Sequence, residues 1–170
     1  MKKLTVFAMT EKGFSVVRGL HEAFPGLIAT VVAARDKGTA EDYFDEIAAF
    51  CGEAQIPFFA RRDTPEIQTE YALAVSWRWL IHAPATKLIV FHDSILPKYR
   101  GFNPLVTALI QGDSEIGVSA LYATEEYDAG DLIGCSTSSI TYPFRIADAF
   151  ALISENFRAL ALEVAAHLAA

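Results

Sequence analysis

The sequence predicts a single α/β domain over residues 1–170, with a mostly parallel twisted sheet, an antiparallel addition and helices on both faces. Three observations support this fold class. Short apolar, β-prone runs alternate with segments of helical periodicity in the first half of the chain, which is typical of βαβ units. The run LIATVVAA at 27–34 is apolar throughout, as expected for a parallel strand covered on both faces. Two strand-like runs after Pro104 follow each other closely, which favours antiparallel pairing because a parallel return needs a longer crossover.

The first half of the chain alternates strands with helices. Apolar residues at helical spacing predict a helix from Phe14 to Phe24. A second helix is expected from Thr39, as its cap, to about Cys51, with Asp42 in a capping-box position. Strands are expected at 4–9, 27–34, 56–60, 71–77 and 87–92.

The second half begins with a short helix over 105–111, which ends at Gly112. The runs GVSALYAT at 117–124 and DLIGCSTSSI at 131–140 predict the antiparallel strand pair. A long helix follows from Phe144 to about Leu168, with an apolar stripe on one face. We interpret this stripe as core packing, with a homodimer seam as the alternative.

Composition and charge narrow the classes of partner. The formal net charge is −7, hydrophobic residues make up 52% and charged residues 21%, as in an ordinary globular protein. There is no long basic run, and the cluster at 98–100 is too short to follow a phosphate backbone, so we expect no nucleic-acid partner. No run is long enough to span a membrane or to act as a signal peptide. Cys51 and Cys135 form no metal-binding or disulfide pattern, so we expect no metal and a cytoplasmic protein with two free thiols.

The chemistry is expected at the end of the strand 87–92. The chain has no G-x-G-x-x-G, P-loop, H-E-x-x-H or G-x-S-x-G motif, and Ser119 reads as a packed hydroxyl within a strand. Ligands of doubly wound sheets bind beyond the carboxyl ends of the strands. His92 and the loop 125–130 are expected at that edge, where Asp128 could hold the imidazole of His92 for acid–base work.

A longer stretch carries a family resemblance. The segment FHDSILPKYRGFNPLVTALIQGDSEIGVSALYATEEYDAGDLI resembles the formyltransferases that use 10-formyltetrahydrofolate, which act on glycinamide ribonucleotide, methionyl-tRNA or sugar nucleotides. The resemblance implies a Rossmann-like formyltransferase fold. Its H-x-S-L-L-P-x-x-R-G, G-[DE]-x-x-x-G-[VT] and D-x-G patterns are matched by His92, Ser94, Ile95, Leu96, Pro97, Arg100, Gly101, Gly112, Asp113, Gly117, Val118, Asp128 and Gly130.

The resemblance also implies a catalytic trio, and this chain departs from it at one position. The family has Asn two residues before the His, where this chain has Val90. By resemblance, His92 stabilises the oxyanion and moves a proton while Asp128 orients a water and favours the imidazolium. Asn103 is the candidate substitute donor, although it can also be a plain cap residue before Pro104.

The resemblance implies 10-formyltetrahydrofolate as the cofactor and a small-molecule amine as the second substrate. A catalytically impaired folate- or partner-binding module and a formyl-folate hydrolase are the alternatives, because Val supplies no oxyanion donor. The residues expected at the folate are Trp77, Arg78, Trp79, Leu80, Tyr122, Ala123, Thr124, Tyr127 and Asp128.

Overall fold

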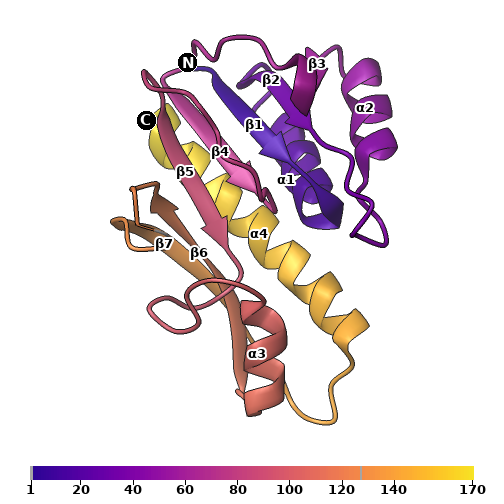
Figure 1. Ribbon diagram of the computed structural model, residues 1–170, viewed down its shortest axis with the longest axis vertical. Helices are drawn as coiled ribbons and strands as arrows, with labels where there is room; N and C mark the ends of the chain where they lie inside the picture. Colours follow the sequence, from indigo (N-terminus) through magenta and orange to yellow (C-terminus); the bar gives the residue numbers. More distant parts are fainter. Residues whose placement is uncertain (1, 127) are drawn as a thin grey trace.

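A seven-stranded mixed sheet forms the centre of the computed structural model, which describes residues 2–126 and 128–170. The strand order is β3-β2-β1-β4-β5-β6-β7 (Figure 1). The first five strands are parallel, whereas β6 and β7 run antiparallel to their neighbours, which confirms the predicted parallel sheet with an antiparallel addition. The strands are β1 (Leu4–Ala8), β2 (Ile28–Ala33), β3 (Phe58–Ala60), β4 (Tyr71–Val75), β5 (Lys87–His92), β6 (Glu115–Tyr122) and β7 (Leu132–Ser139).

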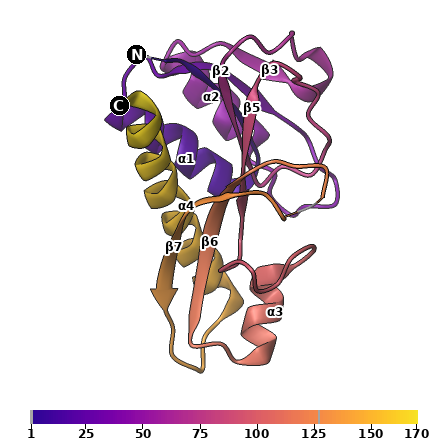
Figure 2. The ribbon, with the colours of Figure 1, turned by 90° about the vertical axis from the view of Figure 1, so that its left-hand side faces the viewer.

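The helices are distributed unequally over the two faces. They are α1 (Thr10–Ala23), α2 (Phe44–Glu53), α3 (Pro104–Gln111) and α4 (Ile146–Ala169), with a 3₁₀ turn η1 (Arg61–Asp63) after β3. Figure 2 shows α1 and α4 on one side of the sheet and α3 on the other, near one end. The buried residues of α1, α2 and α4 share one large core with alternate residues of the strands.

Loops, and not helices, cover the second face over β1, β2 and β4. Phe7, on the opposite face of β1 from Val6, belongs to a smaller cluster against which Ile67, Trp77 and Ile81 pack. The expected helix layer is therefore limited to α3 on this face. Apart from η1, the connections β3–β4 and β4–β5 are irregular, and each contains a proline, which inside a helix removes a hydrogen bond and clashes with the preceding turn.

The predicted start of α2 at Thr39 is wrong. The carboxylate of Asp36 accepts hydrogen bonds from the Thr39 hydroxyl (2.6 Å) and the Gly38 amide (2.9 Å), which holds this segment in a turn. The helix begins five residues later, at Phe44, whose amide donates to the carboxylate of Asp42 (3.0 Å). The polar side chains after β2 therefore close a loop before the helix starts.

The long helix α4 confirms the interpretation of its stripe as core packing. Ile153, Phe157, Leu160 and Val164 are buried against α1 and the sheet, while Phe150 stays partly exposed. Among the described helices, none is both long and apolar enough to cross a membrane.

Candidate functional site

His92 closes β5 on the face of the sheet opposite α1 and α4. Side chains alternate along a strand, and Ile89 and Phe91 lie in the helix-side core. Val90 and His92 therefore share the other face, two residues apart. His92 is only 8% exposed, so its ring contacts protein groups over most of its surface.

Both ring nitrogens of His92 face oxygen acceptors. Nε2 lies 2.8 Å from the carbonyl oxygen of Tyr99, and Nδ1 lies 3.5 Å from Oδ1 of Asp128. A carbonyl accepts only, so Nε2 carries a proton. Oδ1 of Asp128 faces Nδ1, the ring nitrogen that the backbone bond leaves free, so the carboxylate lies where it can orient the imidazole.

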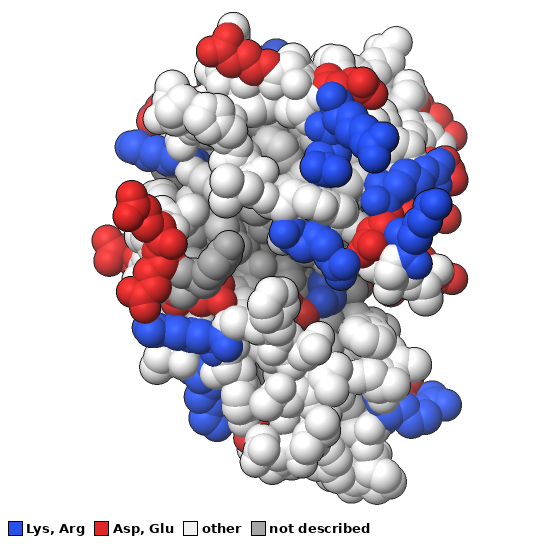
Figure 3. Space-filling model, in the orientation of Figure 1, with Lys and Arg blue, Asp and Glu red and all other residues white. Residues whose placement is uncertain are grey.

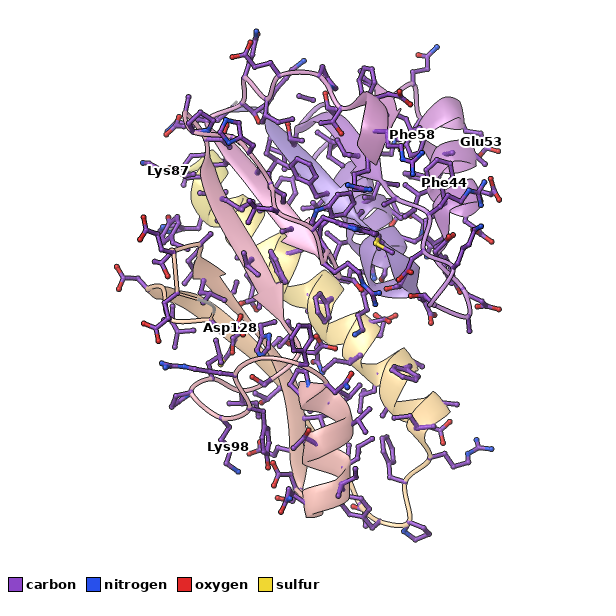
Figure 4. The ribbon with its side chains drawn as sticks, in the orientation of Figure 1. Phe44, Glu53, Phe58, Lys87, Lys98 and Asp128 are labelled. Carbon is purple, nitrogen blue, oxygen red and sulfur yellow. The ribbon has the colours of Figure 1, made fainter. Side chains whose placement is uncertain are left out.

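Asp128 reaches His92 by a return path that strand order alone does not predict. β6 is antiparallel to β5, so its carboxyl end lies beside the start of β5, where the Ala123 amide donates to the carbonyl of Leu88 (2.9 Å). His92 is four residues further along β5, about 13 Å away at strand rise. The loop after β6 therefore turns back before Asp128 arrives beside the end of β5 (Figure 4). Asp128 therefore lies beside His92 as expected, although the loop that carries it starts at the opposite end of β5.

Local backbone geometry fixes the Asp128 carboxylate. Asp128 has φ +54°, in the left-handed region that Asp adopts more readily than most residues. Its Oδ2 accepts a hydrogen bond from the Gly101 amide (2.9 Å), so one carboxylate spans the His92 ring and the loop before α3. One hydrogen bond and one ion-pair contact order the carboxylate, as a group that positions a histidine requires.

Ser119 organises the chain that follows His92. Its hydroxyl donates to the carbonyl of Ser94 (2.7 Å) and accepts from the Leu96 amide (3.1 Å). Asp93 forms an ion pair with Lys12 at the start of α1. The sequence reading of Ser119 as a packed hydroxyl missed this role, since nothing in the pattern of β6 identifies which loop the hydroxyl meets.

Two other predicted residues lie differently from the His–Asp pair. Asn103 is exposed and left-handed (φ +53°) at the start of α3, and its carbonyl accepts from the Thr107 hydroxyl (2.9 Å). Within the described residues, its side chain makes no hydrogen bond to His92 or Asp128. Val90, by contrast, faces the same side as His92 but carries no hydrogen-bond donor.

The tryptophans of the predicted folate segment pack against protein. Trp77 meets Phe7 edge to face (centroids 5.2 Å apart) and Trp79 (5.2 Å), and the guanidinium of Arg61 lies 4.8 Å from the Trp79 ring. The buried Nε1 of Trp77 has no partner among the described residues. Leu80 is 91% exposed.

The remaining predicted folate residues belong to the end of β6 and the loop after it, and Tyr122 and Ala123 lie beside the start of β5 and not beside His92. Tyr122 packs partly against the main core, Ala123 and Thr124 are exposed, and Tyr127 lies outside the described residues. Gly130 passes so close to the Tyr122 carbonyl that an added Cβ would lie 1.7 Å from that oxygen. A glycine is therefore required for the loop to pass at this point.

Charged side chains lie toward both flanks of this side of the molecule. In Figure 3, Lys and Arg side chains gather on the flank that holds β2, β3 and α2, further charged side chains follow the opposite flank, and the surface over α3 is nearly uncharged. Arg78 pairs with Asp36 (2.7 Å) and joins the loops after β4 and β2. Hydrogen bonds from Thr39 and Gly38, with Arg78 nearby, lower the pKa of the Asp36 carboxyl. Among the described residues, no group of three or more His, Cys, Asp or Glu is arranged to hold a metal.

Part of the chain matches a family of known proteins, and relatives match over a similar length. Residues 66–142 match the family model described as formyl transferase. Methionyl-tRNA formyltransferase of Lysinibacillus sphaericus (strain C3-41) is 48% identical over 54 residues, which are 32% of this chain and 17% of that protein. The aligned region therefore covers much less than two thirds of this relative.

Two solved structures share the fold over nearly the whole chain. Phosphoribosylglycinamide formyltransferase from Streptococcus pneumoniae TIGR4 superposes with a TM-score of 0.78 at 18% identity, covering 100% of both chains. WlaRD, a sugar 3N-formyl transferase solved in the presence of dTDP and 5-N-formyl-THF, gives a TM-score of 0.73 at 17% identity, covering 96% of this chain and 61% of that one. At identities of 18% and 17%, the structural similarity shows that the fold is shared.

Proposed function

We propose that this member of the formyltransferase family transfers a formyl group from 10-formyltetrahydrofolate to the amino group of a small metabolite, with His92 and Asp128 as its catalytic pair. The observation that carries the proposal is the His92–Asp128 pair itself. Two residues that are 36 positions apart in the chain lie with Nδ1 and Oδ1 3.5 Å apart, both largely buried, in the segment that matches the family model.

The reaction exchanges one bond to the formyl carbon for another. Bound 10-formyltetrahydrofolate would supply that carbon: the acceptor nitrogen forms a bond to it, and the bond from the carbon to the folate nitrogen breaks. The acceptor amine loses a proton and the leaving nitrogen gains one, so the products are a formamide and tetrahydrofolate. His92, facing Asp128 through Nδ1, is placed to hold the proton in transit and to stabilise negative charge on the formyl oxygen.

The site offers features that fit a folate. The buried Nε1 of Trp77 lacks a partner among the described residues, and a buried donor without a partner costs free energy. Trp79 and Arg61 present an aromatic ring and a cation beside it. The Gly130 turn brings the main chain close to the Tyr122 carbonyl, which fixes the path of the loop that the resemblance places beside the folate.

Calorimetric titration with 5-formyltetrahydrofolate, a stable reduced folate, is the first test. We expect a dissociation constant in the micromolar range or tighter, about −8 kcal/mol. Absence of binding would remove the cofactor assignment, and with it the proposed transfer.

Variants at Asp128 separate chemistry from folding. Asp128→Asn keeps an oxygen for the Gly101 amide and tolerates the left-handed backbone, so we expect the fold to be retained and turnover to fall by about 10²–10⁴. Asp128→Ala also loses the Gly101 bond and should destabilise the fold by about 1–3 kcal/mol. Full activity in Asp128→Asn would contradict a catalytic role for the carboxylate.

Because Val90 offers no hydrogen-bond donor, two alternative functions are also considered: a binding module without catalysis, and a hydrolase. A site with one donor fewer is expected to stabilise a developing oxyanion less, and water can replace the amine as the attacking group. Incubating the protein with 10-formyltetrahydrofolate in the presence and absence of amines distinguishes the three. A formamide product indicates transfer, formate without a formamide indicates hydrolysis, and binding without either product indicates a module.

The acceptor is proposed only as a class. An amino sugar nucleotide is the first acceptor to assay, because the fold covers most of this chain in the superposition with a sugar 3N-formyl transferase. Methionyl-tRNA is the second acceptor to assay, because a segment of methionyl-tRNA formyltransferase is 48% identical to this chain over 54 residues, and its use would contradict the expectation of no nucleic-acid partner.

A further inference from the structure

The two edges of the sheet differ sharply in their protection. β3 has three residues, follows Pro57 and is followed by Arg61 and Arg62, which are features that discourage pairing with another chain. β7 has eight residues, LIGCSTSS, with no charged residue and no proline. Figure 2 views the molecule from the side of β7, and no other described helix or strand lies along its outer edge.

The hydrogen-bond register shows which backbone groups of β7 point outward. The Ile140 amide donates to the Ser114 carbonyl (2.8 Å), so Ile140 turns its backbone groups toward β6. In an antiparallel pair this orientation alternates, and the register with β6 is constant from Gly134 onward. Cys135, Thr137 and Ser139 therefore present their amides and carbonyls to the outside.

The side chains on this edge are also compatible with pairing. Ser136 and Ser138 donate to Oδ1 of Asn156 on α4 (2.9 and 3.1 Å), which anchors the inner face of β7. Cys135, Thr137 and Ser139 alternate with them and are exposed on the opposite face. These three side chains are small, so they leave the edge open to a neighbouring strand.

We propose that β7 is an interface at which two copies of this chain pair antiparallel about a two-fold axis at Thr137, joining their sheets into one. The axis lies at the centre of the regular segment 134–140. Thr137 then exchanges two backbone hydrogen bonds with Thr137 of the second copy, and Cys135 pairs with Ser139 in each direction.

The net charge of the chain and the symmetry of the pairing both favour a second copy of this chain as the partner of β7. Each chain carries a net charge of −7, so two copies repel except where they meet along uncharged surface, and β7 is uncharged. A two-fold pair uses the same edge on both copies and is closed. The short, flanked β3 edge offers no equivalent second site, so the assembly stops at two chains.

Light scattering tests the proposal directly. The wild-type chain is expected at twice 18.6 kDa, and Thr137→Pro at 18.6 kDa. Proline removes an outward amide and leaves the bonds to β6 in place, as edge strands tolerate. Thr137→Val keeps the backbone amide and should remain a dimer. Thermal unfolding of all three shows whether Thr137→Pro has kept its fold.

Cysteine cross-linking tests the register. Opposed residues of a hydrogen-bonded pair have Cα atoms about 5.5 Å apart, within disulfide range, so the double variant Thr137→Cys, Cys135→Ser should oxidise to a covalent dimer. In this register the two native Cys135 residues are four positions apart, about 13 Å along the strand, and the wild type should not cross-link.

Three results would overturn the proposal. A wild-type chain that stays at 18.6 kDa at its highest attainable concentration has no such interface. A folded Thr137→Pro variant that remains dimeric pairs through another surface. A wild type that cross-links through Cys135, together with a double variant that does not cross-link, indicates a different axis. None of these results depends on folate binding or turnover.

Discussion

Replacing Val90 by Asn is expected to raise the rate of formyl transfer. Val90 lies on β5 two residues before His92, and side chains at this spacing share one face of the strand. Its neighbours across the sheet are Ala74 on β4 and Leu121 on β6, and it is partly exposed, so an amide at this position has room beside the imidazole. The family resemblance places Asn at this same position.

The magnitude follows from the value of one oxyanion donor. Removing such a donor typically costs about 10²–10³ in rate, or about 2.7–4 kcal/mol. Supplying it should therefore raise turnover by up to about the same factor. The stability cost is smaller: a fully buried Val contributes about 1.5–3 kcal/mol and strand preference spans about 1 kcal/mol, so a half-buried Val90 should cost about 1–2 kcal/mol on replacement.

The assay is the release of tetrahydrofolate from 10-formyltetrahydrofolate, followed by absorbance with a panel of amines and with water alone. Val90→Leu is the matched control, because Leu is close to Asn in shape and offers no donor. Free energies of unfolding from urea titrations correct the rates for loss of folded protein. If the Asn variant is no faster than the Leu variant, the site does not use a donor at this position and the reasoning from the resemblance fails.

The other predictions concern the loops, the thiols and the pH dependence of stability. Gly130→Ala should abolish folate binding, because its Cβ would meet a backbone oxygen at 1.7 Å. Gly52→Ala in α2, where a Cβ meets nothing within 4 Å, should leave binding intact and add up to about 1 kcal/mol of stability by thermal unfolding. Burial raises the pKa of the Cys51 thiol to about 12, so at pH 8 a thiol reagent should modify only the exposed Cys135 in the native protein and both cysteines in denaturant; two rapid modifications of the native chain would contradict the burial. The pKa of Asp36 is lowered in the folded state, so its carboxylate stabilises the fold above the unfolded pKa of about 3.9 and loses this effect as pH falls through the folded value. The difference in unfolding free energy between wild type and Asp36→Asn should therefore be full at pH 7 and shrink below pH ~4, and a difference that is constant with pH would refute it.

The fold class could be predicted from the sequence because it depends on local patterns. The apolar run that ends at His92 forms β5, and the stripe on α4 packs into the core as its spacing indicates. The ends of the strands were predicted less accurately than their existence. β4 ends at Val75, two residues before the predicted end, because Ser76 adopts a left-handed φ of +55°.

The sequence by itself determined the α/β fold, the strand that delivers His92 and the absence of an amide donor at Val90, because each follows from the order and chemistry of neighbouring residues. Only the tertiary structure decided how Asp128 reaches the histidine. The loop after β6 leaves from the far end of β5 and returns, and the Gly101 amide orients the carboxylate. Contacts between segments that are tens of residues apart depend on strand direction and loop path, which no local pattern encodes. The same reason explains why the outward-facing edge of β7 becomes visible only once the strands are placed in order.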